Sequence, residues 1–221
     1  MLYELRHYTT PDTTSLGTLV KGFGERVIPA WQSGGMRVVG CWTVTIGQLP
    51  RFTAMLAYDD ANQRQEQFAA FRGTEAHQYI VDTGLVRGID TALLSPTAYS
   101  PDPFRFMDAA SPGVFEERVY RGLTPRAFDA VNRRFNDHTM RIFARHGIMP
   151  VGFWRVEIGA DQPSLYYLLR FDDLGDYNPK WGAFRADPEW QQVREESERD
   201  GNILLRIQST ILAPTPFSPM R

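Results

Sequence analysis

The chain has 221 residues, of which 43% are hydrophobic and 23% are charged, and its formal net charge is -2. This composition is typical of a globular protein with room for one large core or for two domains. Basic and acidic residues are interspersed, the lone Cys41 cannot form an intramolecular disulfide, and no apolar run reaches roughly 18 residues. We therefore expect a cytoplasmic protein that neither binds nucleic acid nor inserts into a membrane.

The first hundred residues predict six elements. Apolar and polar side chains alternate over residues 3–8, which indicates a strand, and a helix with periodic apolar residues follows from the capping residue Asp12 to a glycine pair. Two runs rich in apolar residues within 38–58 predict a hairpin. A second helix begins after Asp60, and the last strand ends at Pro96. The order is therefore strand, helix, strand, strand, helix, strand.

The second half repeats the first. A shift of 112 residues brings identical residues opposite each other, among them Glu4 and Glu116, Arg6 and Arg118, Tyr8 and Tyr120, Trp42 and Trp154, and Gly47 and Gly159. The shift becomes 113 after the hairpin and 118 at the last strand, so the insertions fall in connections. The chain is thus predicted to be a tandem duplication.

The repeated order predicts an α+β fold of two tandem ferredoxin-like βαββαβ repeats. Both helices of such a unit cover one sheet face, and the other face, rich in Trp and apolar residues, needs a cover of its own. We expect the two sheets to pack face to face as an intramolecular dimeric α/β barrel. The predicted repeats span 1–101 and 114–221, joined by a linker over 102–113.

Four segments resemble the NIPSNAP family, which belongs to the dimeric α/β-barrel superfamily. They are Leu2-Tyr3-Glu4-Leu5-Arg6-His7-Tyr8, Val39-Gly40-Cys41-Trp42 with Gly47, Tyr58-Asp59-Asp60, and Leu212-Ala213-Pro214-Thr215-Pro216-Phe217-Ser218-Pro219. The resemblance covers nearly the whole chain, twice. The second copy departs from the motif at Glu117, where the motif has leucine.

The resemblance implies the fold and the sheet-to-sheet barrel, and it implies little chemistry. Wider relatives include cofactor-free monooxygenases, polyketide cyclases and haem-binding chlorite dismutases, so it leaves three functions open. The leading one is binding of a small apolar or aromatic metabolite, with cofactor-free proton transfer, cyclisation or monooxygenation. The others are a non-catalytic protein-binding or assembly module and a haem-binding protein. The leading hypothesis needs no cofactor, and association into a homo-oligomer stays open.

Strand alternation places Glu4, Arg6 and Tyr8 on one face of the first strand. We expect this Glu-x-Arg-x-Tyr set and its repeat to face the barrel interior, where each carboxylate keeps its charge beside a guanidinium. The predicted ligand-binding residues are Glu4, Arg6, Trp42, Tyr58, Glu116, Arg118, Trp154 and Tyr167. In the alternative interpretation each Glu-Arg pair only satisfies itself and fixes strand register.

A catalytic centre seldom needs both copies of a residue, so unmatched residues are candidates for function. Unmatched histidines include His7, opposite Val119, and His138, opposite Arg26. We predict His138 as a general base, together with the phenols of Tyr8 and Tyr120, although a histidine of this kind can equally be a packing or surface residue. The histidines are scattered and no paired-cysteine spacing occurs, so no metal site is expected.

Overall fold

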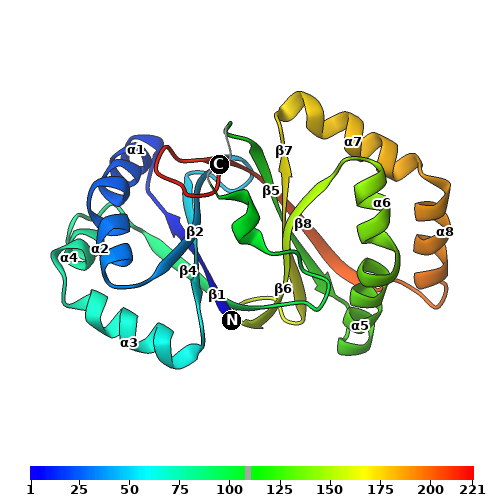
Figure 1. Ribbon diagram of the computed structural model, residues 1–221, viewed down its shortest axis with the longest axis horizontal. Helices are drawn as coiled ribbons and strands as arrows, with labels where there is room; N and C mark the ends of the chain where they lie inside the picture. Colours follow the sequence, from blue (N-terminus) through cyan, green and yellow to red (C-terminus); the bar gives the residue numbers. More distant parts are fainter. Residues whose placement is uncertain (108–110) are drawn as a thin grey trace.

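The protein is seen here in a computed structural model that describes residues 1–107 and 111–221. Eight antiparallel strands form a closed barrel in the order β1-β3-β2-β8-β5-β7-β6-β4. The helices of the first half flank the barrel on one side and those of the second half on the other (Figure 1). The predicted α+β fold, a tandem of ferredoxin-like units joined as an intramolecular dimeric α/β barrel, is confirmed.

The two halves have the same order of elements. The first contains β1 (Leu2–Thr9), α1 (Thr13–Gly22), the π-helical turn η1 (Phe23–Val27), α2 (Ile28–Ser33), β2 (Arg37–Ile46), β3 (Arg51–Tyr58), α3 (Ala61–Arg72), α4 (Glu75–Asp82) and β4 (Gly88–Pro96). After a 3-10 turn, η2 (Pro103–Phe106), the second contains β5 (Val114–Gly122), α5 (Pro125–Arg134), the π-helical turn η3 (Phe135–Thr139), α6 (Met140–Arg145), β6 (Met149–Ile158), β7 (Ser164–Phe171), α7 (Leu174–Ala186), α8 (Pro188–Ser197) and β8 (Leu204–Pro214).

Local signals in the sequence fix the helix starts. Asp12 accepts a hydrogen bond from the Ser15 amide at 2.7 Å, and Thr124 accepts one from the amide of Ala127 at 3.1 Å. Asp60 and Asp173 cap α3 and α7 in the same way. Side-chain acceptors satisfy amides that would otherwise lack partners in the first helical turn. The same capping chemistry therefore starts corresponding helices in both halves.

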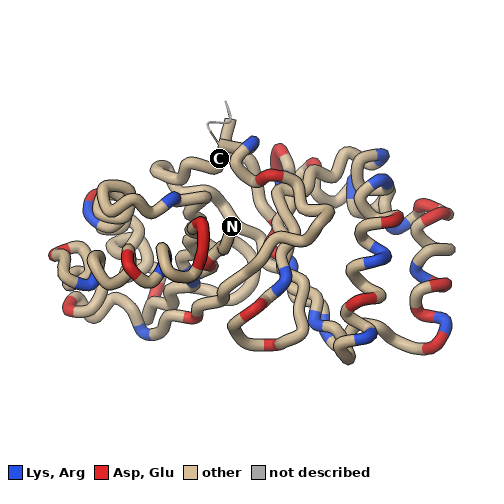
Figure 2. The backbone as a smooth tube through the Cα atoms, turned by 60° about the horizontal axis from the view of Figure 1, so that its bottom comes forward, with Lys and Arg blue, Asp and Glu red and all other residues tan. Residues whose placement is uncertain are grey.

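The two sheets are joined at their edges as well as facing each other. Strand β2 pairs with β8 and β4 pairs with β6, so each sheet completes the hydrogen bonds of the other. A closed barrel leaves no unpaired strand edge. Basic and acidic residues are mixed over the helices outside (Figure 2). No helix in the described residues combines the length and the apolar character needed to cross a bilayer.

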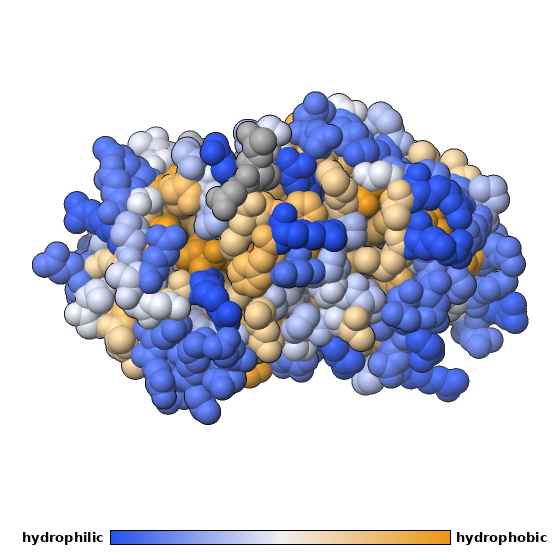
Figure 3. Space-filling model, in the orientation of Figure 1, coloured by the Kyte–Doolittle hydropathy of each residue, from blue (hydrophilic) through white to orange (hydrophobic). Residues whose placement is uncertain are grey.

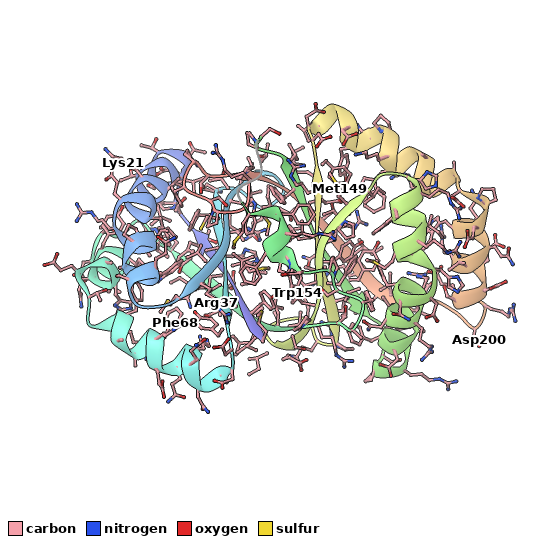
Figure 4. All side chains as sticks on the ribbon, viewed as in Figure 1. Lys21, Arg37, Phe68, Met149, Trp154 and Asp200 are labelled. Atoms are coloured by element: carbon pink, nitrogen blue, oxygen red, sulfur yellow. The ribbon has the colours of Figure 1, made fainter. Side chains whose placement is uncertain are left out.

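The strands separate three apolar cores. One lies inside the barrel and holds Tyr3, Leu5, Trp42 and Trp154, while the other two lie between each sheet and its helices. Trp154 lies in the middle of the molecule, and Phe68 lies on α3 (Figure 4). Both faces of every sheet are therefore buried, one by helices and one by the opposite sheet.

This double burial overturns one prediction. Glu4, Arg6 and Tyr8 face the helices rather than the barrel interior, and so do Glu116, Arg118 and Tyr120. Alternation separates the two faces of β1 but does not say which is inner when both are buried. The helices supply polar partners that the strand pattern does not reveal, since Arg64 of α3 binds Glu4 and Trp181 of α7 binds Glu116.

The indole rings of Trp42 and Trp154 each lie against a glycine two residues earlier in the same strand. A methyl group on Gly40 would lie 2.2 Å from Cη2 of Trp42, and one on Gly152 would lie 2.3 Å from Cη2 of Trp154. Both indoles are fully buried, so neither ring has free space into which to move.

We predict that Gly40→Ala and Gly152→Ala each lower the free energy of unfolding by about 1–3 kcal/mol, because the added methyl overpacks the barrel core. Urea denaturation followed by circular dichroism measures the change. Gly88→Ala in strand β4 is the control, since a methyl there meets nothing within 4 Å, and its effect should stay within about 0.5 kcal/mol. Equal stability of all three variants would contradict the packing argument.

Candidate functional site

A pocket of about 550 Å³ opens at the barrel end where the β2–β3 and β6–β7 hairpins turn. Its wall includes Leu5, Leu94, Val119 and Val156 among apolar residues, and His7, Arg51, Asp90, Glu117, Tyr166 and Gln208 among polar ones. This is the volume of a typical small-molecule site, which combines apolar walls with a few convergent polar groups. The pocket lies between the two sheets and takes residues from both halves.

The opposite end of the barrel is covered by residues of η2 and of the C-terminal tail. Phe104 and Phe106 pack against the barrel core, and Met220 is fully buried in it. Arg105 donates to the carbonyl of Pro150 near the start of β6, and Arg170 near the end of β7 donates to the carbonyl of Arg221. On the face shown in Figure 3, hydrophobic residues gather over the middle of the molecule. Within the described residues the barrel is therefore a cup that opens at the end with the β2–β3 and β6–β7 hairpins.

Four polar side chains meet on the pocket wall. Arg51 Nη2 donates to Glu117 Oε1 at 3.0 Å, and the Tyr166 hydroxyl donates to Glu117 Oε2 at 3.3 Å. His7 Nε2 lies 3.8 Å from the same Oε2, and its Nδ1 lies 3.0 Å from Thr53 Oγ1. Glu117 is 5% exposed and Arg51 8% exposed. A buried carboxylate is thus held by one cation and one phenol, with an imidazole beside it.

The surroundings set the protonation of these groups. Burial lowers the pKa of His7 below its ordinary value, the Glu117 charge opposes this shift, and the Arg51 charge adds to it. Burial also raises the pKa of Tyr166 well above its ordinary value, and Glu117 adds to the rise. At neutral pH the site therefore combines a neutral imidazole, able to accept a proton, with a phenol that keeps its own.

None of these four polar pocket residues is matched by the same residue type in the other half. His7, Glu117, Arg51 and Tyr166 stand opposite Val119, Leu5, Ser164 and Thr53 respectively. The fold needs neither a charge nor an imidazole at these positions, since each is occupied by a different residue type in the other half. The polar cluster is therefore an addition to the scaffold.

The predicted site residues of the first half lie together, but outside the cup. Glu4 accepts hydrogen bonds from Arg6 at 2.7 Å, from Arg64 at 2.9 Å and from Tyr58 at 3.3 Å. Arg6 also donates to the Tyr8 hydroxyl at 2.8 Å. These contacts link β1 and β3 to α3 beneath the helices.

The second half has an equivalent cluster beneath α7. Glu116 accepts from Arg118 at 2.6 Å and from the Trp181 indole at 2.8 Å, and Arg118 reaches the Tyr120 hydroxyl at 3.1 Å. Tyr167 packs edge-on against Tyr120 with ring centroids 5.1 Å apart. Both clusters therefore connect a sheet to its own helices and lie on the far side of that sheet from the pocket.

The two predicted tryptophans lie inside the barrel, below the pocket. Trp42 contacts Phe115, and Trp154 contacts Tyr3 and the pocket residue Tyr166. Their rings fill the closed end of the cup.

His138 lies in a surface groove between α5 and α8, on the outer side of the second sheet. It is therefore separated from Tyr8, Tyr120 and the barrel pocket.

Sequence reasoning noted His7 as unmatched but did not assign it a role, and it missed Arg51 and Tyr166. The usable signal was the departure at Glu117, a charged residue where both the motif and the first copy have leucine.

The fold defines the class of protein: a dimeric α/β barrel completed within one chain. The NIPSNAP family model matches residues 3–101 and 115–219, and the chain belongs to this family. Among curated proteins, none is significantly similar to it.

Solved structures include similar chains. An anthrone oxidase-like protein is 10% identical, with 97% of this chain and 91% of that one covered at a TM-score of 0.64. A NIPSNAP-like domain protein from Burkholderia xenovorans is 26% identical over 48% of this chain and 89% of that one, at a TM-score of 0.44. A NIPSNAP family protein of unknown function from Agrobacterium tumefaciens is 24% identical over 52% and 99%, at 0.45.

We predict that His7 titrates below the ordinary imidazole pKa of about 6.5, as measured by NMR of the imidazole protons against pH. Glu117→Gln should lower the His7 pKa further, because the carboxylate favours the imidazolium, whereas Arg51→Gln should raise it. Since the unfolded chain binds this proton more readily, His7 should reduce stability as the pH falls through 6.5. Shifts of the same sign in both variants would contradict the described electrostatics.

Proposed function

We propose that the barrel pocket binds a small, largely apolar or aromatic metabolite and transfers a proton from it without a cofactor. The observation that supports this most directly is the set of four unmatched polar residues in a pocket of about 550 Å³ between otherwise equivalent sheets. Leu5, Leu94, Val119 and Val156 suit the body of such a ligand, and the polar cluster suits an acidic O–H or C–H group on it.

His7 is the proposed general base. When Nδ1 donates to Thr53 Oγ1, Nε2 carries the lone pair and can accept a proton from the ligand. Glu117, at 3.8 Å from Nε2, then stabilises the imidazolium. Arg51 and Tyr166 keep the Glu117 carboxylate in place and hydrogen-bonded. The ligand is left as a phenolate or enolate.

Deprotonation is the step that this site supports. A cyclisation or monooxygenation of a phenol or an enolisable ketone would begin with the same anion, so the proposed proton transfer is common to both. The wide mix of apolar groups around the cluster favours a ligand whose charge, once formed, is spread over an aromatic ring. Such an anion is less costly to bury than a localised one.

The test uses 4-nitrophenol, because its phenol and phenolate forms absorb at different wavelengths. Titration into the protein near neutral pH should give saturable binding and a larger phenolate fraction than in buffer. His7→Val, which introduces the residue of the other half, should keep binding but lose the extra phenolate, with about a tenfold change in the ionisation ratio for a pKa shift of one unit.

His138→Ala provides the comparison, because the residue lies outside the barrel and was the base that the sequence predicted. It should bind and ionise the probe as the unaltered protein does. If His138→Ala loses the phenolate signal and His7→Val retains it, the barrel site is excluded as the proton acceptor. Failure of every protein to bind the probe saturably would contradict the binding step itself.

A further inference from the structure

A second cavity lies in the second half, on the helix side of the sheet. It has a volume of about 220 Å³ and lies between the sheet, α5, α7 and α8. Its wall carries four arginines, namely Arg118, Arg134, Arg185 and Arg194, and one carboxylate, Glu198. It is separated from the barrel pocket by the sheet, because Arg118 and Glu117 are neighbours on β5 that point to opposite faces.

Two of these arginines are held against tryptophan rings. The Arg118 guanidinium carbon lies 4.6 Å from the Trp181 ring centroid, and that of Arg134 lies 5.3 Å from the Trp190 centroid. Cation–π contacts of this length fix the guanidinium planes before any ligand arrives. The cavity is therefore preorganised rather than formed by flexible surface side chains.

Two of the arginines already hold carboxylates of the protein. Arg134 donates to Glu198 at 2.9 Å and to Ser197 at 3.1 Å through Nη1, and Arg118 uses its terminal nitrogens for Glu116 and Tyr120. The Nε atoms of both arginines are fully buried, so a ligand would meet the other parts of the side chains that line the cavity.

Part of this charge cluster has no counterpart in the first half. Arg134 stands opposite Gly22, Arg194 opposite Val81 and Glu198 opposite Leu85. The Tyr79 ring fills the space over Gly22, where an added methyl would lie 2.1 Å from the Tyr79 hydroxyl oxygen. Arg118 and Arg185 have counterparts in the first half, Arg6 and Arg72, so the unmatched residues Arg134, Arg194 and Glu198 are the part of the cluster that the fold does not require.

We propose that this cavity is a second binding site, for a small carboxylate carried on an aromatic or flat apolar body. Glu116 pairs with Arg118 and Glu198 pairs with Arg134, so the four lining arginines still exceed these two carboxylates, which favours an anion. Planar guanidinium groups match a carboxylate with paired hydrogen bonds. Trp181, Trp190 and the neighbouring Phe184 provide flat apolar walls, and the volume admits a single small ring.

The test is a titration with benzoate, followed by the indole N–H signals in a ¹H–¹⁵N NMR spectrum. Trp181 and Trp190 line the cavity, whereas Trp31 lies in the first half and Trp42 and Trp154 lie in the barrel. The expected result is a saturable shift of the Trp181 and Trp190 signals, with the other three unchanged. Benzamide, which has the same shape without the charge, should bind at least about tenfold more weakly.

Three variants separate binding from folding. Glu198→Gln removes the competing carboxylate and should tighten benzoate binding severalfold, an effect that loss of structure would not produce. Arg134→Gln should weaken binding by about tenfold or more. If that variant fails to fold, the double variant of the exposed arginines, Arg185→Gln with Arg194→Gln, should weaken binding instead, and Arg72→Gln in the first half is its matched control.

The outcomes are distinct from those of the barrel test. Shifts of Trp42 and Trp154 alone would place benzoate in the barrel and overturn the second site. Equal affinity for benzoate and benzamide would also overturn it, since the arginines would then contribute nothing. Inorganic phosphate that displaces benzoate at similar concentration would show a general anion site and contradict the aromatic part of the proposal.

Discussion

The edge pairing of β2 with β8 and of β4 with β6 is the constraint on which the rest of the structure depends. Each half alone is a four-stranded sheet with two free edges and one face lacking helices. Pairing removes the free edges, and the same closure buries the inner faces against each other. Covalent linkage of the halves makes this closure intramolecular, so it does not depend on protein concentration. The covered end of the barrel and the pocket at its open end both follow from this closure.

Closure within one chain also lets the two halves differ. In a dimer of identical subunits, any residue placed on the inner wall appears twice, and two buried copies of Glu117 would face each other's charge across the barrel. The duplicated chain has a single glutamate here, opposite a leucine in the repeat, together with one Arg51 to neutralise it. A buried carboxylate is tolerated when it is paired and hydrogen-bonded, which this asymmetry allows.

The sequence was sufficient to predict the repeat, the order of elements and the barrel, because the apolar periods, the caps and the matched tryptophans all act locally or in register. It was insufficient to orient β1. Tyr3 and Leu5 on one face and Tyr8 on the other are equally buried, so hydrophobicity does not distinguish inside from outside. The deciding partners, Arg64 and Trp181, lie some 60 residues away on helices, at contacts that no strand pattern encodes.

The site itself was partly accessible to sequence reasoning. Residues shared by the halves, such as Glu4 and Glu116, bind a sheet to its helices, whereas several residues found in one half, such as Glu117 and Arg134, line cavities. Strand β5 contributes to both cavities. Glu117 points into the barrel and Arg118 toward α7, so adjacent residues contribute to two cavities on opposite faces of one sheet. Comparing the halves with each other, rather than matching motifs, is therefore the better guide to function in a duplicated fold, because each half shows which side chains the scaffold can do without.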